Sequence, residues 1–296
     1  MTTTRDYIGK YLLTVHQYME GINKRAIEEG IDSVIEFVRT VDNDKTELID
    51  FHDTTKIIGG ESYKYDVFNK AHEALYLDQW DVSSIGNGTI SGFVADAMKH
   101  TDNLVNRQFG VPQFLSLINN AEKQNRERYE EALYSVYFGE DEEMAFKKAV
   151  NCFGGKYPLI AFLFFIKDRD RFLPTSPDSF DSIFETMGLG YKMSARCSWS
   201  NYCEFIAIIT CAQEYLSKSG VCSHEVLLLD AHSAIWLMHY SEYKVWHNET
   251  KDINIPMRPK KKIRKADGTI SYQCGRCDYS FKQSDRCPEC GQLVKI

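Results

Sequence analysis

Four cysteines near the C-terminus are arranged as two pairs with the spacing C-x2-C-x9-C-x2-C. They are Cys274, Cys277, Cys287 and Cys290. A C-x2-C turn directs both sulfurs at one ion, and two such turns complete the tetrahedral coordination that zinc prefers. Because four thiolates leave no open position on the metal, the zinc is expected to be structural. A segment this short cannot build a hydrophobic core of its own, so we expect the metal to stabilise its fold.

Basic residues precede these cysteines. Six of them lie within eight positions: Arg258, Lys260, Lys261, Lys262, Arg264 and Lys265. Directly before the pattern of a zinc ribbon, over residues 273–296, such a stretch predicts contacts to the phosphates of nucleic acid, with DNA as the expected partner. Tyr272, Tyr279 and Phe281 are available to stack on bases. The alternative interpretation of residues 256–272 is a solvated, flexible linker.

Charge is divided unevenly along the 296 residues. Residues 1–257 hold 25 Lys/Arg and 38 Asp/Glu, a net of −13, whereas residues 258–296 hold 10 Lys/Arg and 4 Asp/Glu, a net of +6. A polyanion should therefore meet the C-terminal segment first.

A second group of residues with chemical potential lies in the body of the chain. Residues 177–218 predict a helix, a Gly-Leu-Gly turn at Gly188 and Gly190 followed by Lys192, and a second helix. A G-x-G turn between helices lets backbone N–H groups approach a phosphate. Asp230 and His232 follow in an apolar segment.

These features, over about residues 177–240, resemble the helix-hairpin-helix DNA glycosylases. The resemblance implies that Asp230, within an Asp-x-His pattern with His232, activates water or stabilises the sugar cation. It also implies that Lys192 is the amine nucleophile of a lyase step. The target base would be flipped into a pocket lined by aromatics, for which Trp199, Tyr202 and Trp236 are candidates.

Other interpretations of the same residues remain open. Gly188 can simply end a helix, and Asp230 and His232 can form a hydrogen-bonded polar pair in an apolar helix. The charged run 167–171 is either an exposed helix end or a source of nuclease carboxylates. His224, His232, His239 and His247 recur every seven or eight positions and are a candidate second metal site. The five remaining cysteines are interpreted as small buried hydrophobes.

The expected fold is mainly α: a helical body over 1–255, the basic linker 256–272 and the ribbon 273–296. Residues 47–60 predict a small hairpin. Ser176-Pro177 and Ser198 mark helix starts. Further helices are predicted over 5–29 (ending at Gly30), 65–77, 92–105, 112–132, 140–152, 157–166 and 225–240.

No apolar run is long enough to cross a bilayer, and the N-terminal residues lack the features of a secretory signal. We therefore expect a cytoplasmic protein without a membrane partner.

Three functions fit these observations. The first is a DNA glycosylase, with or without lyase activity, that removes damaged or modified bases; defence against phage with modified DNA is a further hypothesis. The second is a metal-dependent nuclease. The third is a non-enzymatic module that binds nucleic acid or a protein of unknown identity.

Overall fold

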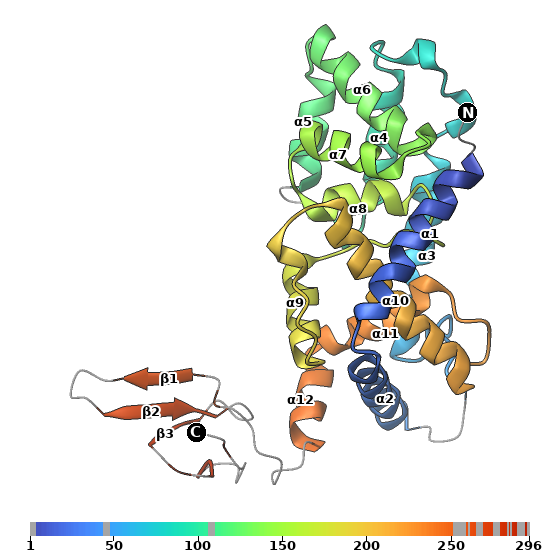
Figure 1. Ribbon diagram of the computed structural model, residues 1–296. Helices are drawn as coiled ribbons and strands as arrows, with labels where there is room; N and C mark the ends of the chain where they lie inside the picture. Colours follow the sequence, from blue (N-terminus) through green and yellow to red (C-terminus); the bar gives the residue numbers. More distant parts are fainter. Residues whose placement is uncertain are drawn as a thin grey trace. The chain divides into compact units, whose positions relative to one another are not determined.

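The chain folds into two compact units, which we call the body (Met1–His239) and the C-terminal unit (Tyr240–Ile296). The computed structural model describes residues 4–43, 48–105 and 110–250, and in the remaining part residues 259, 261–264, 269–274, 279–282, 284, 286–288 and 294. The expectation of a mainly helical chain is confirmed (Figure 1). The C-terminal unit starts at Tyr240, earlier than the change in composition at residue 256 predicts.

Helices account for all of the regular structure described in the body. The α-helices are α1 (Thr4–Gly21), α2 (Lys24–Val41), α3 (Tyr63–Glu73), α4 (Thr89–Ala97), α5 (Gly110–Asn119), α6 (Lys123–Phe138), α7 (Glu142–Phe153), α8 (Tyr157–Phe165), α9 (Pro177–Thr186), α10 (Trp199–Ser219) and α11 (Leu228–Trp236). Short 3₁₀ helices are Ile58–Ser62, Leu77–Gln79, Val82–Ser84, Met98–His100, Met193–Ala195 and Leu237–His239. Across the described residues, the helices are either too short or too polar to span a membrane.

Two helices form the centre of the body. Helix α8 is buried at eight of its nine positions, as its uninterrupted apolar sequence predicts. Helix α10 packs against α1, α2 and α11, and these contacts bring the two ends of the body together (Figure 1). The core therefore includes residues from both the first and the last helices of the body.

Capping residues mark several helix starts where the sequence predicts them. The Ser198 hydroxyl accepts the N–H of Asn201 at the start of α10, and Asp141 accepts the N–H of Met144 at the start of α7. Pro177 occupies the first turn of α9. These starts depend on local chemistry, and local sequence is sufficient to find them.

The prediction of one helix over 5–29 that ends at Gly30 is wrong. The side chain of Asn23 accepts the N–H of Ala26 and starts a second helix, α2, which runs through Gly30. A Cβ atom at Gly30 would lie 2.9 Å from the Cε atom of Met187. Glycine is therefore used there for close packing against the segment after α9.

The predicted hairpin over 47–60 is also wrong for its described part, residues 48–60. Ile49 forms a single parallel bridge with Cys222, and the chain then turns twice before the 3₁₀ helix at Ile58. Asp50 accepts the N–H of His52, and Asp53 accepts the N–H of Thr55. These side-chain bonds to nearby backbone replace the ladder that a hairpin would need.

The C-terminal unit contains α12 (Ser241–Thr250) and a three-stranded antiparallel sheet in the order β1 (Lys261–Arg264), β2 (Ile270–Gln273) and β3 (Ser280–Lys282). Lys262 pairs with Tyr272, and Tyr272 pairs with Phe281. The segment 256–272 is thus not only a linker: its described residues include β1 and most of β2.

Candidate metal centre

Asp230 lies in the first turn of α11 and is only 1% exposed. Its Oδ2 atom accepts the backbone N–H of Leu227 at 2.8 Å, and its Oδ1 atom accepts the hydroxyl of Tyr65 at 2.6 Å. Burial, followed by this bond, raises the pKa of Tyr65, so the phenol remains the donor. Each carboxylate oxygen has a second lone pair, so Asp230 can still bind a cation.

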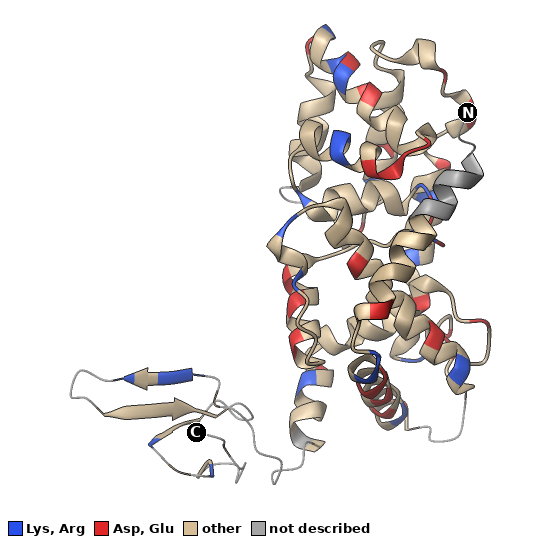
Figure 2. Cartoon of the chain, viewed as in Figure 1, with Lys and Arg blue, Asp and Glu red and all other residues tan. Residues whose placement is uncertain are grey.

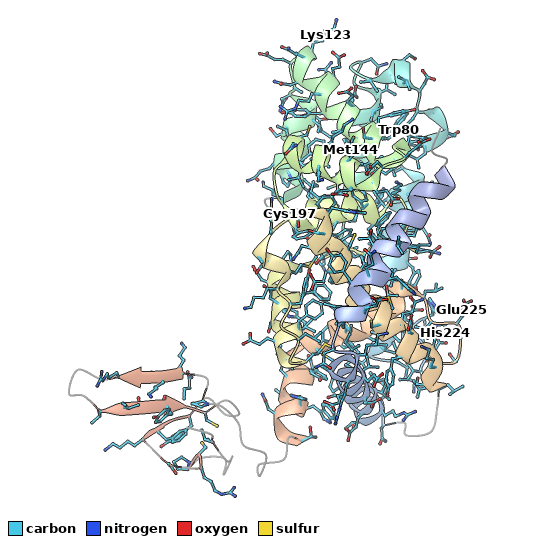
Figure 3. The ribbon with its side chains drawn as sticks, in the orientation of Figure 1. Trp80, Lys123, Met144, Cys197, His224 and Glu225 are labelled. Carbon is cyan, nitrogen blue, oxygen red and sulfur yellow. The ribbon has the colours of Figure 1, made fainter. Side chains whose placement is uncertain are left out.

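Two loops meet beside Asp230 and carry histidines to it. The N–H of Ile49 donates to the carbonyl of Val221 at 2.8 Å, and the N–H of Ser223 donates to the carbonyl of Ile49 at 3.0 Å. This pairing places the loop that contains His52 against the loop that contains His224. Figure 3 labels His224 on the loop between α10 and α11.

The two nitrogens of His224 have different surroundings. Its Nε2 atom lies 3.7 Å from Asp230 Oδ2, is buried, and has no hydrogen-bond partner among the described residues. Its Nδ1 atom lies 3.2 Å from Ser223 Oγ and 3.6 Å from a carboxylate oxygen of Asp50. A proton on Nδ1, directed at these oxygens, leaves the lone pair of Nε2 facing Asp230. Metal-binding histidines are oriented in this way.

His52 completes the group from the exposed side. Its ring lies between the rings of Tyr65 and His224, with centroid separations of 5.0 and 4.9 Å. His52, His224 and Asp230 each offer one potential ligand atom, and these three atoms lie within 4.8 Å of one another. We call this group the His52–His224–Asp230 centre. Tetrahedral zinc with bonds of about 2.0–2.1 Å places its ligand atoms about 3.4 Å apart, so these side chains would have to close by up to about 1.4 Å.

The donor set defines the chemistry that this centre can support. Two imidazoles and one carboxylate hold zinc in hydrolytic enzymes and iron(II) in oxygenases, and both kinds of site keep at least one position open for water or substrate. His52 is exposed, so this member of the centre reaches solvent.

A buried polar network lies behind Asp230. Lys64 is 1% exposed, and its Nζ atom lies 2.7 Å from Glu61 Oε2, 3.1 Å from His232 Nδ1 and 3.2 Å from Ser233 Oγ. An ammonium group has three N–H donors, and each has a partner here. Burial lowers the pKa of Lys64, while Glu61 opposes that shift. Because Tyr65 and Lys64 are adjacent and both bind α11, together they fix the position of Asp230.

His232 belongs to this network and not to the metal centre. Its Nε2 atom lies 3.0 Å from the carbonyl oxygen of Pro174, which can only accept, so Nε2 carries the proton and Nδ1 accepts from Lys64. Burial and then the charge of Lys64 lower the pKa of His232 well below its ordinary value. Asp230 bonds Leu227 and Tyr65, whereas His232 bonds Pro174 and Lys64, so the two residues are not a mutually bonded pair.

Lys192 lies apart from Asp230 and His232 in the contacts of the described residues. It is exposed and precedes the 3₁₀ helix Met193–Ala195, where its carbonyl accepts the amide of Asn201. Its ammonium group has no hydrogen bond or ion pair with any described residue. The arrangement supplies no local reason for it to act as a nucleophile.

The two glycines of the predicted hairpin end a helix and begin a long connection. Gly188 has φ +75° after α9, and Leu189 N–H bonds back to the carbonyl of Phe184, an ending typical of helices. Gly190 lines a cavity of about 380 Å³ beside Glu204. No lysine or arginine is among the described residues that line this cavity, so it offers phosphate no cation.

The aromatic residues predicted to line a base pocket are largely core. Trp199 and Tyr202 are buried at 7% and 0% exposure, and Trp236 stacks on His232. Of the five body cysteines interpreted as buried hydrophobes, Cys203 and Cys211 are buried, whereas Cys152, Cys197 and Cys222 are only partly buried. Burial raises the pKa of Cys197, Cys211 and Cys222 to about 11 and that of Cys203 further. These thiols are poor nucleophiles at neutral pH.

The charged run 167–171 is tied into ion pairs and ring contacts. Arg171 pairs with Glu142 and stacks on Tyr11, and Lys167 lies 3.5 Å from the same carboxylate. Among the four regularly spaced histidines, the structure brings only His224 to a candidate centre.

The described part of the predicted ribbon brings two of the four candidate zinc ligands into one core. Cys274 and Cys287, one from each predicted pair, are buried in a common cluster with Tyr272, Phe281 and Val294. Cys277 and Cys290 lie outside the described residues, as do Arg258, Lys260 and Lys265. Tyr272 and Phe281 are not available for base stacking because they form this core, whereas Tyr279 is 45% exposed.

Gly59 supports the loop that carries His52, and its replacement is a test of the centre. A Cβ atom there would lie 1.9 Å from the carbonyl oxygen of Asp53, a backbone atom next to His52. Gly59→Ala should therefore displace this loop, lower stability by about 1–3 kcal/mol and weaken metal binding. Gly60→Ala is the matched control, because nothing lies within 4 Å of the position that its methyl group would take. Equal melting temperatures and metal affinities for the two variants would contradict this role of Gly59.

No protein-family model, characterised protein or solved structure matches the chain.

Proposed function

We propose that the chain is a metal-dependent hydrolase that cleaves phosphoester bonds in nucleic acid at the His52–His224–Asp230 centre. One observation carries the proposal: three ligand atoms of the types that divalent metals prefer lie within 4.8 Å, and one of them, His224 Nε2, is buried without a hydrogen-bond partner among the described residues. An unsatisfied buried nitrogen is costly, and a metal ion would satisfy it.

The surrounding residues have distinct roles in this proposal. A divalent cation lowers the pKa of the water it binds and polarises the phosphoryl oxygen. Asp50 and Ser223 hold His224 in the tautomer that binds metal, and Tyr65 and Leu227 hold the carboxylate of Asp230. Hydrolysis consumes one water: its oxygen bonds to phosphorus, the ester P–O bond breaks, and the leaving oxygen takes up a proton.

The choice of nucleic acid rests on the C-terminal unit. Strand β1 exposes Lys261, Lys262 and Arg264, and Figure 2 shows this strand as basic. The four cysteines would hold structural zinc and stabilise the sheet that presents these residues. Lysines and arginines on one strand match a phosphate backbone and carry no sequence information, and DNA is the proposed partner.

A glycosylase remains the second candidate, and one observation favours it. Asp230 lies at the start of a helix beside side chains that reach solvent, as in the family that the sequence resembles. Such an enzyme would cleave the N-glycosidic bond without a metal, and Lys192 would act only in a lyase step.

The two functions are separated by labelled plain and base-modified DNA duplexes incubated with and without EDTA. The hydrolase predicts strand breaks that require a divalent cation, disappear with EDTA and return when metal is restored. His52→Ala should abolish them, and His16→Ala, at an exposed position on α1, should not. Breaks that persist in EDTA and appear only after alkali would overturn the hydrolase in favour of the glycosylase. A borohydride-trapped adduct that is lost in Lys192→Ala would add the lyase step.

A further inference from the structure

Arg169 lies next to the metal centre and is connected to it by one side chain. Its guanidinium carbon is 5.0 Å from the ring centroid of Tyr65 and 4.9 Å from that of Phe68. The hydroxyl of the same Tyr65 donates to Asp230 at 2.6 Å. Tyr65 therefore contacts both the guanidinium of Arg169 and the carboxylate of Asp230 that would bind metal.

Arg169 is held in place without being neutralised. Its Nη1 atom donates to the amide oxygen of Asn69 at 3.2 Å, which is an uncharged partner. The carboxylate of Asp170 lies 4.0 Å from Nε and is 75% exposed, so this pair is weak and screened by solvent. A guanidinium has five N–H donors, and only one makes a hydrogen bond to a described residue.

The neighbouring Arg171 has the opposite character. It pairs with Glu142 and lies 3.7 Å from Asp168, and its side chain is only 18% exposed. Two arginines in one short loop thus have different uses: Arg171 is engaged in ion pairs within the body, whereas Arg169 keeps its charge and most of its donors. Its side chain is 29% exposed and can reach a ligand from solvent.

We infer that Arg169 is the anion-binding residue of this centre and binds a phosphate group of the substrate. This inference rests on the proposed hydrolase function and names the residue that would bind the phosphate of its substrate. Contacts with Tyr65 and Phe68 hold the guanidinium in place, and four of its five N–H donors make no hydrogen bond to a described residue. A planar edge with two parallel donors matches two oxygens of a phosphate.

Two carboxylates would balance a bound divalent cation at this centre, which leaves little net positive charge to attract an anionic substrate. Asp230 and Asp50 both lie beside His224. Arg169 offsets this charge on the side of Tyr65 and would retain a phosphate while its ester bond is at the metal. A neutral carboxylic ester would gain nothing from this residue.

The inference is tested on the metal-loaded protein with two small substrates, bis(p-nitrophenyl) phosphate and p-nitrophenyl acetate. Arg169→Gln should raise KM for the phosphodiester by about 10- to 100-fold, as the loss of charge-assisted hydrogen bonds predicts, with a smaller change in kcat. Arg169→Lys keeps the positive charge but loses the paired N–H donors of the guanidinium. Its KM for the phosphodiester should therefore lie between those of the parent and Arg169→Gln. Arg128→Gln is the matched control, since Arg128 is exposed on α6 and its side chain bonds only the carbonyl of Asn151 among the described residues. Hydrolysis of the acetate should be unchanged in all of them.

A second measurement does not depend on turnover. Inorganic phosphate, titrated calorimetrically into metal-loaded protein, should bind Arg169→Gln about 10- to 100-fold more weakly than the parent. If Arg169→Gln and the parent had equal phosphate affinity and equal KM, the inference would be overturned. Metal-dependent cleavage by the parent would still support the proposed hydrolase function. Failure of the parent to bind metal through His52 and His224 would instead overturn the proposed function, and the inference with it.

Discussion

Replacing His224 with alanine should remove one equivalent of divalent metal from the protein and lower phosphodiester hydrolysis by about a thousandfold. The expected size follows from the several kilocalories per mole that a metal contributes to charge stabilisation in the transition state. His224 supplies the nitrogen that faces Asp230 at 3.7 Å, so its loss leaves only His52 and the carboxylate. Metal content by mass spectrometry and initial rates measure both effects.

The C-terminal cysteines provide the control for this result, because they would hold a different ion. Cys274→Ser should remove a second equivalent and leave the His224-dependent one in place. Cobalt distinguishes the two sites, since only the cysteine site can show thiolate-to-metal charge-transfer absorption. His16→Ala should retain both equivalents. A His224→Ala protein with unchanged metal content would show that this imidazole does not hold metal, and the metal centre would then be rejected.

Replacing Lys64 with methionine should lower the free energy of unfolding of the body by about 3–5 kcal/mol. Methionine has a similar length, so the change removes the charge and three polar contacts while leaving most of the volume. The carboxylate of Glu61 then remains buried without its cation, and uncompensated buried charge costs this much. Thermal or denaturant unfolding followed by far-ultraviolet circular dichroism measures the loss.

Two further variants test the cause. Glu61→Gln combined with Lys64→Met should recover part of the stability, because removing both charges removes the unpaired one. Lys147→Met breaks the exposed pair with Glu143 on α7, where the lysine side chain is 66% exposed, and should cost less than about 0.5 kcal/mol. A Lys64→Met protein as stable as the Lys147→Met protein would refute the importance of the buried network.

Local chemistry makes much of the helical framework predictable. Ser198, Asp141 and Pro177 mark helix starts by satisfying or lacking backbone N–H groups, and these effects operate within one turn. The prediction fails at Gly30, where the reason for glycine is a methionine side chain more than 150 residues away in sequence. It also fails at residues 48–60, whose backbone is bonded to residues 221–223 and to its own aspartates.

The candidate centre is predictable only in part, for the same reason. Asp230 stands out by its position in an apolar helix, and His224 by a histidine spacing, but His232 is grouped with Asp230 by the Asp-x-His pattern and Lys192 by the family resemblance. His52 and Tyr65 carry no local pattern that separates them from other surface residues. They become recognisable when α3 and two distant loops are folded onto α11.

The bridge between Ile49 and Cys222 also places the centre in the order of folding. These residues are 173 positions apart, so their contact closes a very long loop and carries a high entropic cost that other contacts must offset first. During synthesis, His52 leaves the ribosome long before His224 and Asp230, and the nascent body holds no complete ligand set until its last helix is available. Metal should therefore bind this centre only after the body has folded, so metal binding is a measure of complete folding.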